Sequence, residues 1–152
     1  NVAGALRVQD RWLAERHNPE THLIPNVLKA TKDQPLKIFG TDWKTKDGTC
    51  IRDYIHVVDL AEAHVLALDA LKFGTHEIIN LGSGGGYSVR EVVDTASKVV
   101  GYEIPSVNVD RRAGDPAVLI ASIDKAKSLL NWSPTRDLEA MISDAYETFR
   151  AD

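Results

Sequence analysis

A glycine-rich junction between an apolar run and an amphipathic segment, Ile78–Asp94 (IINLGSGGGYSVREVVD), constrains the fold of this chain most. A strand, a glycine turn and a helix in this order can cradle a phosphate on the amides at the helix start. A dinucleotide fingerprint, however, needs glycines at its first, third and sixth positions. Counted from Gly82 the sixth position is Tyr87, and counted from Gly84 it is Val89. We therefore predict a structural turn between a buried strand and a helix, and not a cofactor loop.

The helix after this turn has a clear beginning and end. Ser88, followed three residues later by Glu91, predicts a capping box, and the helix should end near Gly101. Short apolar runs alternate with helical patterns along the rest of the chain, which is typical of an α/β fold. We expect further helices at Thr21–Lys32, at Leu60–Leu71 with Asp59 as N-cap, at Asp124–Trp132 and at Leu138–Arg150, and extended segments at Leu36–Gly40, Cys50–Val57, Glu77–Gly82 and around Val107 and Val109.

Composition excludes several classes of protein. The 152 residues suit one domain, and a net charge of −4 without a lysine/arginine block disfavours nucleic-acid binding. The single cysteine, Cys50, can form neither a disulfide nor a thiolate metal site within one chain. No apolar run reaches the roughly 18 residues of a membrane helix and no secretory signal leads the chain, so we expect a cytoplasmic protein without a membrane partner. The opening NVAGALRV lacks a methionine, which suggests a fragment or a processed product.

The histidines do not predict a metal centre. His17, His56, His64 and His76 have no cluster of carboxylate or thiol partners in the sequence, so we expect no metal site. His56 and His64 are predicted to be packed side chains, and the tryptophans are interpreted as packing residues as well.

Three segments of the sequence together resemble the C-terminal half of the UDP-glucose (UDP-galactose) 4-epimerases, which are extended short-chain dehydrogenase/reductases. They are PETHLIPNVLKA (residues 19–30), GTDWKTKDGTCIRDYIHVVDLAEAHVLAL (residues 40–68) and RRAGDPAVLIASIDKAKSLLNW (residues 111–132). The resemblance covers nearly the whole chain and is weakest from Leu6 to Arg16. It implies a nucleotide-sugar-binding domain over residues 1–152, with a small mixed sheet, flanking helices and no N-terminal Rossmann domain.

The resemblance also implies that the catalytic and cofactor-binding residues lie outside this chain. Members of the family use a Tyr-x-x-x-Lys pair, but none of the tyrosines here has a lysine four positions later. The chain alone should therefore be inactive, and NAD should be bound by the missing half. Residues 52–82 are expected to pack on that half and to expose an apolar helix face in its absence, which would promote self-association; the full-length protein is expected to be a homodimer.

The implied reaction interconverts UDP-glucose and UDP-galactose through a 4-keto intermediate with bound NAD. A stand-alone nucleotide-sugar-binding module without chemistry is one alternative. A part of a related enzyme, such as a UDP-uronate epimerase or a nucleotide-sugar dehydratase, is another.

Arginine is the side chain best suited to a diphosphate, since its planar donors match paired oxygens. Arg52 and Arg112 match UDP-contacting arginines of the family and should converge on the diphosphate beside the strand that contains Phe39. From the sequence alone, a structural ion pair explains Arg52 equally well. Arg111 matches less well and is expected to be solvated.

The resemblance assigns the remaining contacts by position. Lys37, Ile38 and Phe39 match the strand that holds uracil, although Phe39 would otherwise be taken for an ordinary core residue. His22 and Leu23 match positions that hold the ligand near its phosphates, and Asn1 matches a substrate-binding asparagine. Asp115 fits the ribose hydroxyls or, alternatively, caps the loop after Gly114. Leu119 falls where relatives vary the sugar pocket, and its intermediate size favours plain hexoses over N-acetylhexosamines.

Overall fold

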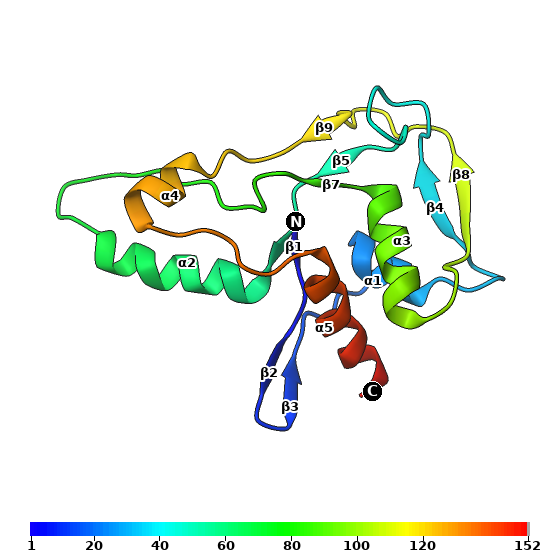
Figure 1. The fold of residues 1–152 in the computed structure, drawn as a ribbon, viewed down its shortest axis with the longest axis horizontal. Coiled ribbons are helices and arrows are strands. Elements are labelled where there is room, and N and C mark those ends of the chain that lie inside the picture. Colours follow the sequence, from blue (N-terminus) through cyan, green and yellow to red (C-terminus); the bar gives the residue numbers. More distant parts are fainter. Residues whose placement is uncertain (152) are drawn as a thin grey trace.

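A computed structural model describes residues 1–151 and confirms the α/β class. Its strands contain at most four residues and fall into four small sheets (Figure 1). Two sheets are parallel pairs, β1 (Val2–Ala3) with β6 (Ile55–His56) and β4 (Leu36–Phe39) with β8 (Ser106–Val109). The others are the antiparallel hairpin of β2 (Leu6–Val8) and β3 (Arg11–Leu13) and a mixed sheet ordered β7 (Tyr87–Ser88), β5 (Ile51–Arg52), β9 (Val118–Leu119).

The helices supply most of the packing because the sheets are so small. They are α1 (Leu23–Lys29), α2 (Val57–Ala70), α3 (Val89–Val100), α4 (Asp124–Leu130) and α5 (Leu138–Arg150). Buried residues form two clusters. The larger one joins α1, α3 and α5 to β4, and the smaller one joins α2 and α4 around Trp132. Figure 1 shows the same division, with α2 and α4 at one end of the molecule and α1, α3, β4 and β8 at the other.

The junction after the glycine turn forms as predicted. The Ser88 hydroxyl accepts a hydrogen bond from the Glu91 amide at 3.1 Å, and the Glu91 carboxylate accepts one from the Ser88 amide at 2.8 Å. This is the reciprocal pairing of a capping box. The helix ends at Gly101, whose left-handed backbone (φ 83°) is the usual helix stop.

The beginning of α2 differs from the prediction. The helix starts at Val57, and its N-cap is His56, whose Nδ1 accepts from the Val58 amide at 3.1 Å. Asp59 instead lies in the first turn, where its buried carboxylate accepts hydrogen bonds from the backbone and side chains of Thr135 and Arg136. The residue expected to cap the helix therefore binds a loop that is distant in the sequence. The local sequence pattern does not indicate this contact.

Residues 77–82 do not form the predicted strand. Ile79 and Leu81 pack against the smaller core cluster, whereas Ile78 is 72% exposed, so the alternation of side chains is present. No described strand pairs with this segment, and an extended chain becomes a strand only when its backbone groups find a neighbour.

Two other helices are shorter than predicted. In α1, the Glu20 carboxylate accepts hydrogen bonds from the amides of Thr21 and His22 and holds them outside the helix. In α4, Asn131 adopts a left-handed conformation (φ 50°) and ends the helix at Leu130.

The outer face of α2 is apolar and exposed, in agreement with the expectation that its surface is uncovered. Val65, Leu68 and Leu71 are 61%, 68% and 73% exposed. His64, on the same helix, is exposed and not packed as predicted, whereas His56 is fully buried. Over the described residues, no helix combines the length and apolarity that crossing a membrane requires.

Candidate functional site

A groove of about 740 Å³ lies between α1, β4, β5 and the loop before β9. Eight of the ten residues predicted to bind substrate line it: Asn1, His22, Leu23, Lys37, Phe39, Arg52, Arg112 and Asp115. They come from segments distant in the sequence, so the fold brings together residues that the sequence related only by motif.

The two arginines enter the groove in different ways. The Arg52 guanidinium is anchored by hydrogen bonds to the carbonyl oxygens of Ile51 (2.9 Å) and Pro116 (2.8 Å), and it lies 3.5 Å from the Asp115 carboxylate. The Arg112 guanidinium lies over the Phe39 ring, 3.8 Å from its centroid. Both features that the sequence left open for Arg52, an ion pair and a place in the groove, are therefore present in the structure.

β4 contributes Leu36, Lys37 and Phe39 to the lining of the groove. Phe39 is only half-buried. Ile38 packs in the larger core cluster, where it is 2% exposed. Its side chain therefore does not line the groove, and only its backbone, paired with β8, lies near it.

Leu119 is also absent from the lining. It lies on β9 opposite Arg52 in the parallel ladder, and its side chain is 60% exposed. Arg111 is exposed, as expected, and it also stacks on Trp43 at 4.0 Å and forms an ion pair with Asp42 at 2.7 Å.

Helix α1 contributes groove residues that the sequence analysis did not single out. Asn26 and Lys29 line the groove together with His22. Residues spaced by three or four positions share one face of a helix, so the position of His22 already indicated both of them. This spacing is the signal that could have identified them.

The groove is electropositive although the chain is acidic. Its lining contains four cationic side chains and a single carboxylate, which are Lys29, Lys37, Arg52, Arg112 and Asp115. Burial raises the pKa of the Cys50 thiol and of the Tyr54 hydroxyl, so both stay protonated at neutral pH. The groove is suited to bind an anion, and neither group is a ready nucleophile.

The glycine turn does not fit a dinucleotide. The Asp53 carboxylate accepts hydrogen bonds from the Ser83 amide (2.6 Å) and hydroxyl (2.7 Å), so both donors of Ser83 are already paired. The Ser83 hydroxyl in turn accepts from the Gly86 amide at 3.1 Å. The amides of Ser83 and Gly86 are therefore paired within the protein.

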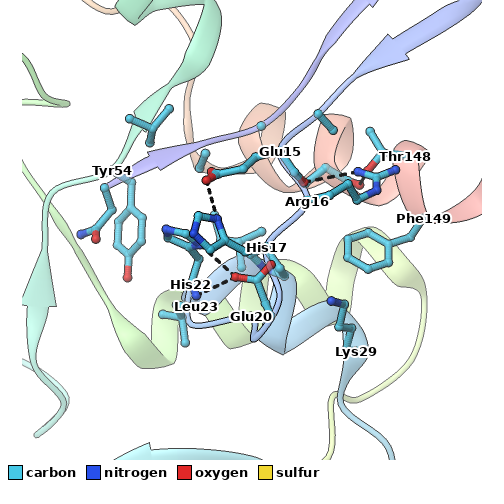
Figure 2. Close-up of a pocket in the computed structure, with 18 residues that line it drawn as sticks. Glu15, Arg16, His17, Glu20, His22, Leu23, Lys29, Tyr54, Thr148 and Phe149 are labelled. Carbon is cyan, nitrogen blue, oxygen red and sulfur yellow. Dashed lines mark hydrogen bonds and ion pairs between the residues drawn. The ribbon is translucent and has the colours of Figure 1, made fainter.

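A smaller cavity of about 200 Å³ adjoins the groove and shares Asn1, His22, Leu23, Lys29 and Tyr54 with it (Figure 2). One sequence prediction is wrong here, because His17 does have a carboxylate partner. Its Nδ1 lies 2.7 Å from Glu15, and its ring lies 5.0 Å from that of His22. The hairpin and the loop that follows it bring these residues together.

Comparison with known proteins gives one consistent result. A family model described as the NAD dependent epimerase/dehydratase family matches residues 6–82. The UDP-glucose 4-epimerase of Corynebacterium glutamicum is 51% identical over 149 residues, which are 96% of this chain but 44% of that protein. The chain thus spans less than half the length of the curated relatives it matches.

Solved structures resemble this chain in the same way. A crystal structure of UDP-glucose 4-epimerase superimposes with a TM-score of 0.89 at 45% identity, over 100% of this chain and 47% of that one. The UDP-glucose-4-epimerase from Stenotrophomonas maltophila with bound NAD and formylated UDP-arabinopyranose matches with a TM-score of 0.89 at 36% identity, over 99% and 46% of the two chains.

Proposed function

Because this chain belongs to the NAD dependent epimerase/dehydratase family, we propose that it is the UDP-sugar-binding part of a UDP-glucose 4-epimerase. The observation that carries the proposal is that Arg52 and Arg112 line one groove together with Phe39. Relatives that share 36–51% of its residues are named UDP-glucose 4-epimerases, and one of them holds a UDP-sugar. The whole protein would then interconvert UDP-glucose and UDP-galactose.

Each part of a uridine diphosphate finds a matching group in the groove. Arg52 and Arg112 offer charge-assisted donors to the diphosphate. Phe39 offers an apolar ring beside Lys37 for the uracil, and Asp115 offers an acceptor for the ribose hydroxyls. Because Arg52 is already held by two carbonyl oxygens, little side-chain freedom is lost when it binds a phosphate.

The cofactor belongs elsewhere in this proposal. The family is NAD dependent, but the glycine turn of this chain is filled by Asp53 and does not fit a dinucleotide. We place the NAD site and the catalytic residues outside residues 1–151, with α2 packing against the part that carries them. A domain that holds the nucleotide firmly and the hexose loosely would let the hexose rotate while the nucleotide stays bound. Such a domain would supply differential binding.

Calorimetric titration of UDP into the chain tests the proposal. Arg112→Gln should weaken binding at least tenfold, since hydrogen bonds to charged groups contribute about 1.5–3 kcal/mol. The matched control is Arg111→Gln, because Arg111 is the adjacent arginine but stacks on Trp43 outside the groove; UDP should bind this variant as it binds the unaltered chain. Equal losses in the two variants, or no binding of UDP at all, would contradict the assignment.

A turnover assay separates this proposal from an independent enzyme. With NAD and UDP-galactose, the 152-residue chain should form no UDP-glucose. Formation of product would show that the chain contains catalytic residues of its own. Binding of UDP by the chain without any turnover is also the behaviour of a stand-alone module, and a full-length relative in the same assay provides the positive control.

A further inference from the structure

Three side chains with metal-binding atoms converge beside the smaller cavity. Glu15, His17 and His22 each offer one ligand atom, and these atoms all lie within 4.8 Å of one another. Figure 2 shows the two imidazoles side by side, with Glu15 above them and Glu20 below. None of these residues except His22 belongs to the nucleotide groove, so the cluster is not explained by the proposed function.

A fourth residue fixes the orientation of one imidazole. Glu20 Oε1 lies 2.9 Å from Nδ1 of His22 and also accepts hydrogen bonds from the amides of Thr21 (2.9 Å) and His22 (2.8 Å). The Glu20 side chain is only 11% exposed.

A carboxylate oxygen 2.9 Å from Nδ1 accepts a hydrogen bond from that nitrogen, which leaves Nε2 as the ligand atom of the His22 ring. Metal-binding histidines are commonly held in this way, with the second nitrogen donating to a carboxylate. The arrangement therefore adds an orienting partner to the three converging ligands.

We propose that Glu15, His17 and His22 form a zinc site, with Glu20 as the positioning residue for His22. Two imidazoles and one carboxylate with an open fourth position are a ligand set that Zn²⁺ uses. Bonds of about 2.1 Å in tetrahedral geometry place ligand atoms roughly 3.4 Å apart, so the cluster must contract slightly on binding. The side chains of Glu15 and His17 are 59% and 49% exposed, and their rotamers can supply this movement.

The location connects the proposed zinc site to the groove. His22 lines both the groove and the smaller cavity, and it lies directly before α1. A metal held there would tie the loop after the β2–β3 hairpin to the beginning of α1. Without a metal, the same residues form two separate side-chain pairs, Glu15 with His17 and Glu20 with His22.

Calorimetric titration of zinc chloride into the untagged chain distinguishes the two arrangements. We expect one Zn²⁺ per chain. Glu15→Gln and His17→Gln should each weaken binding at least tenfold, because each removes a ligand. Glu20→Gln should weaken it by about 10–100-fold, the usual effect of losing an orienting partner.

The matched control is His64→Gln, which removes an exposed histidine of α2 far from the cluster. It should leave zinc binding unchanged. Circular dichroism of each variant establishes that it is folded before its titration is interpreted. Absence of zinc binding by the unaltered chain overturns the proposal. Equal binding by the His17→Gln, Glu15→Gln and control variants overturns it as well, since either result leaves only the two side-chain pairs.

Discussion

Single residues in this protein make contacts that their local sequence does not predict. Asp53 is one example, because its carboxylate accepts hydrogen bonds from the amide and hydroxyl of Ser83 and from the Ala121 amide. It joins the glycine turn to the segment after β9. The turn is therefore built around a carboxylate of the protein itself.

Gly82→Ala should destabilise the chain by about 2 kcal/mol or more, since a Cβ at this position would lie 2.2 Å from Asp53 Oδ2 and break its hydrogen bonds. Gly85 is the matched control, because a Cβ added to it would have no neighbouring atom within 4 Å and its φ is not positive. Gly85→Ala should be neutral or slightly stabilising. Chemical denaturation measures both; similar values for the two variants would refute this view of the turn.

Asp59 predicts how stability depends on pH. Burial raises its pKa, but hydrogen bonds from Arg136 and Thr135 lower it below the usual range. A depressed folded-state pKa means that the carboxylate stabilises the fold fully above the unfolded value of about 3.9, and that this contribution is lost as the pH falls through the folded pKa.

Asp59→Asn should therefore cost about 2 kcal/mol at pH 7 and flatten the loss of stability below pH 4. Urea denaturation at several pH values is the measurement. Asp69→Asn, at an exposed position of the same helix, serves as the control and should leave the acid limb unchanged. An Asp59→Asn variant with the acid sensitivity of the unaltered chain would argue against the assignment.

At the scale of elements, the beginning of α3 is the most completely specified feature. Ser88 is fully buried, caps the helix through Glu91 and also donates its hydroxyl hydrogen to Asp47. One residue thus connects β7, α3 and the loop around Asp47.

Ser88→Ala should lower the free energy of unfolding by about 1–2 kcal/mol, the usual cost of losing an N-cap. Ser128→Ala removes an exposed hydroxyl of α4 that contacts only the Lys125 carbonyl, and should change stability by less than about 0.5 kcal/mol. Thermal unfolding followed by circular dichroism compares them. Equal effects would mean that the capping box contributes nothing in particular.

At the scale of the whole molecule, α2 presents an apolar face to solvent at one end of the molecule (Figure 1). Its exposed leucines are followed along the chain by Phe73 and Ile78, both also exposed. Apolar patches of this kind promote association. We proposed above that this face packs against the part of the protein that carries the cofactor.

The isolated chain should self-associate through this face. Its average mass in sedimentation experiments should rise with concentration, and Leu68→Lys should reduce that rise. Tyr102→Lys replaces a 51% exposed side chain beyond the end of α3 and should not affect it. A chain that stays monomeric at high concentration would count against the prediction.

Much of the fold could be predicted because its signals are local. The capping box of α3, the stop at Gly101 and the range of α5 depend on residues within one or two turns of each other, and all appear in the structure. The α/β class follows from the alternation of short apolar runs with helical patterns along the chain. The beginning of α2 and the segment 77–82 were predicted wrongly because distant partners, or their absence, decide them.

The sequence by itself determined which residue types are available to the proposed nucleotide-sugar groove and which local elements carry them, since motif spacing and helix caps depend on neighbouring residues. Only the tertiary structure decided that Arg112 stacks on Phe39, that Asp53 fills the glycine turn, and that His17 lies beside His22. The physical reason is that these contacts join segments with no common period or spacing. Their distances depend on how the helices pack around two separate cores.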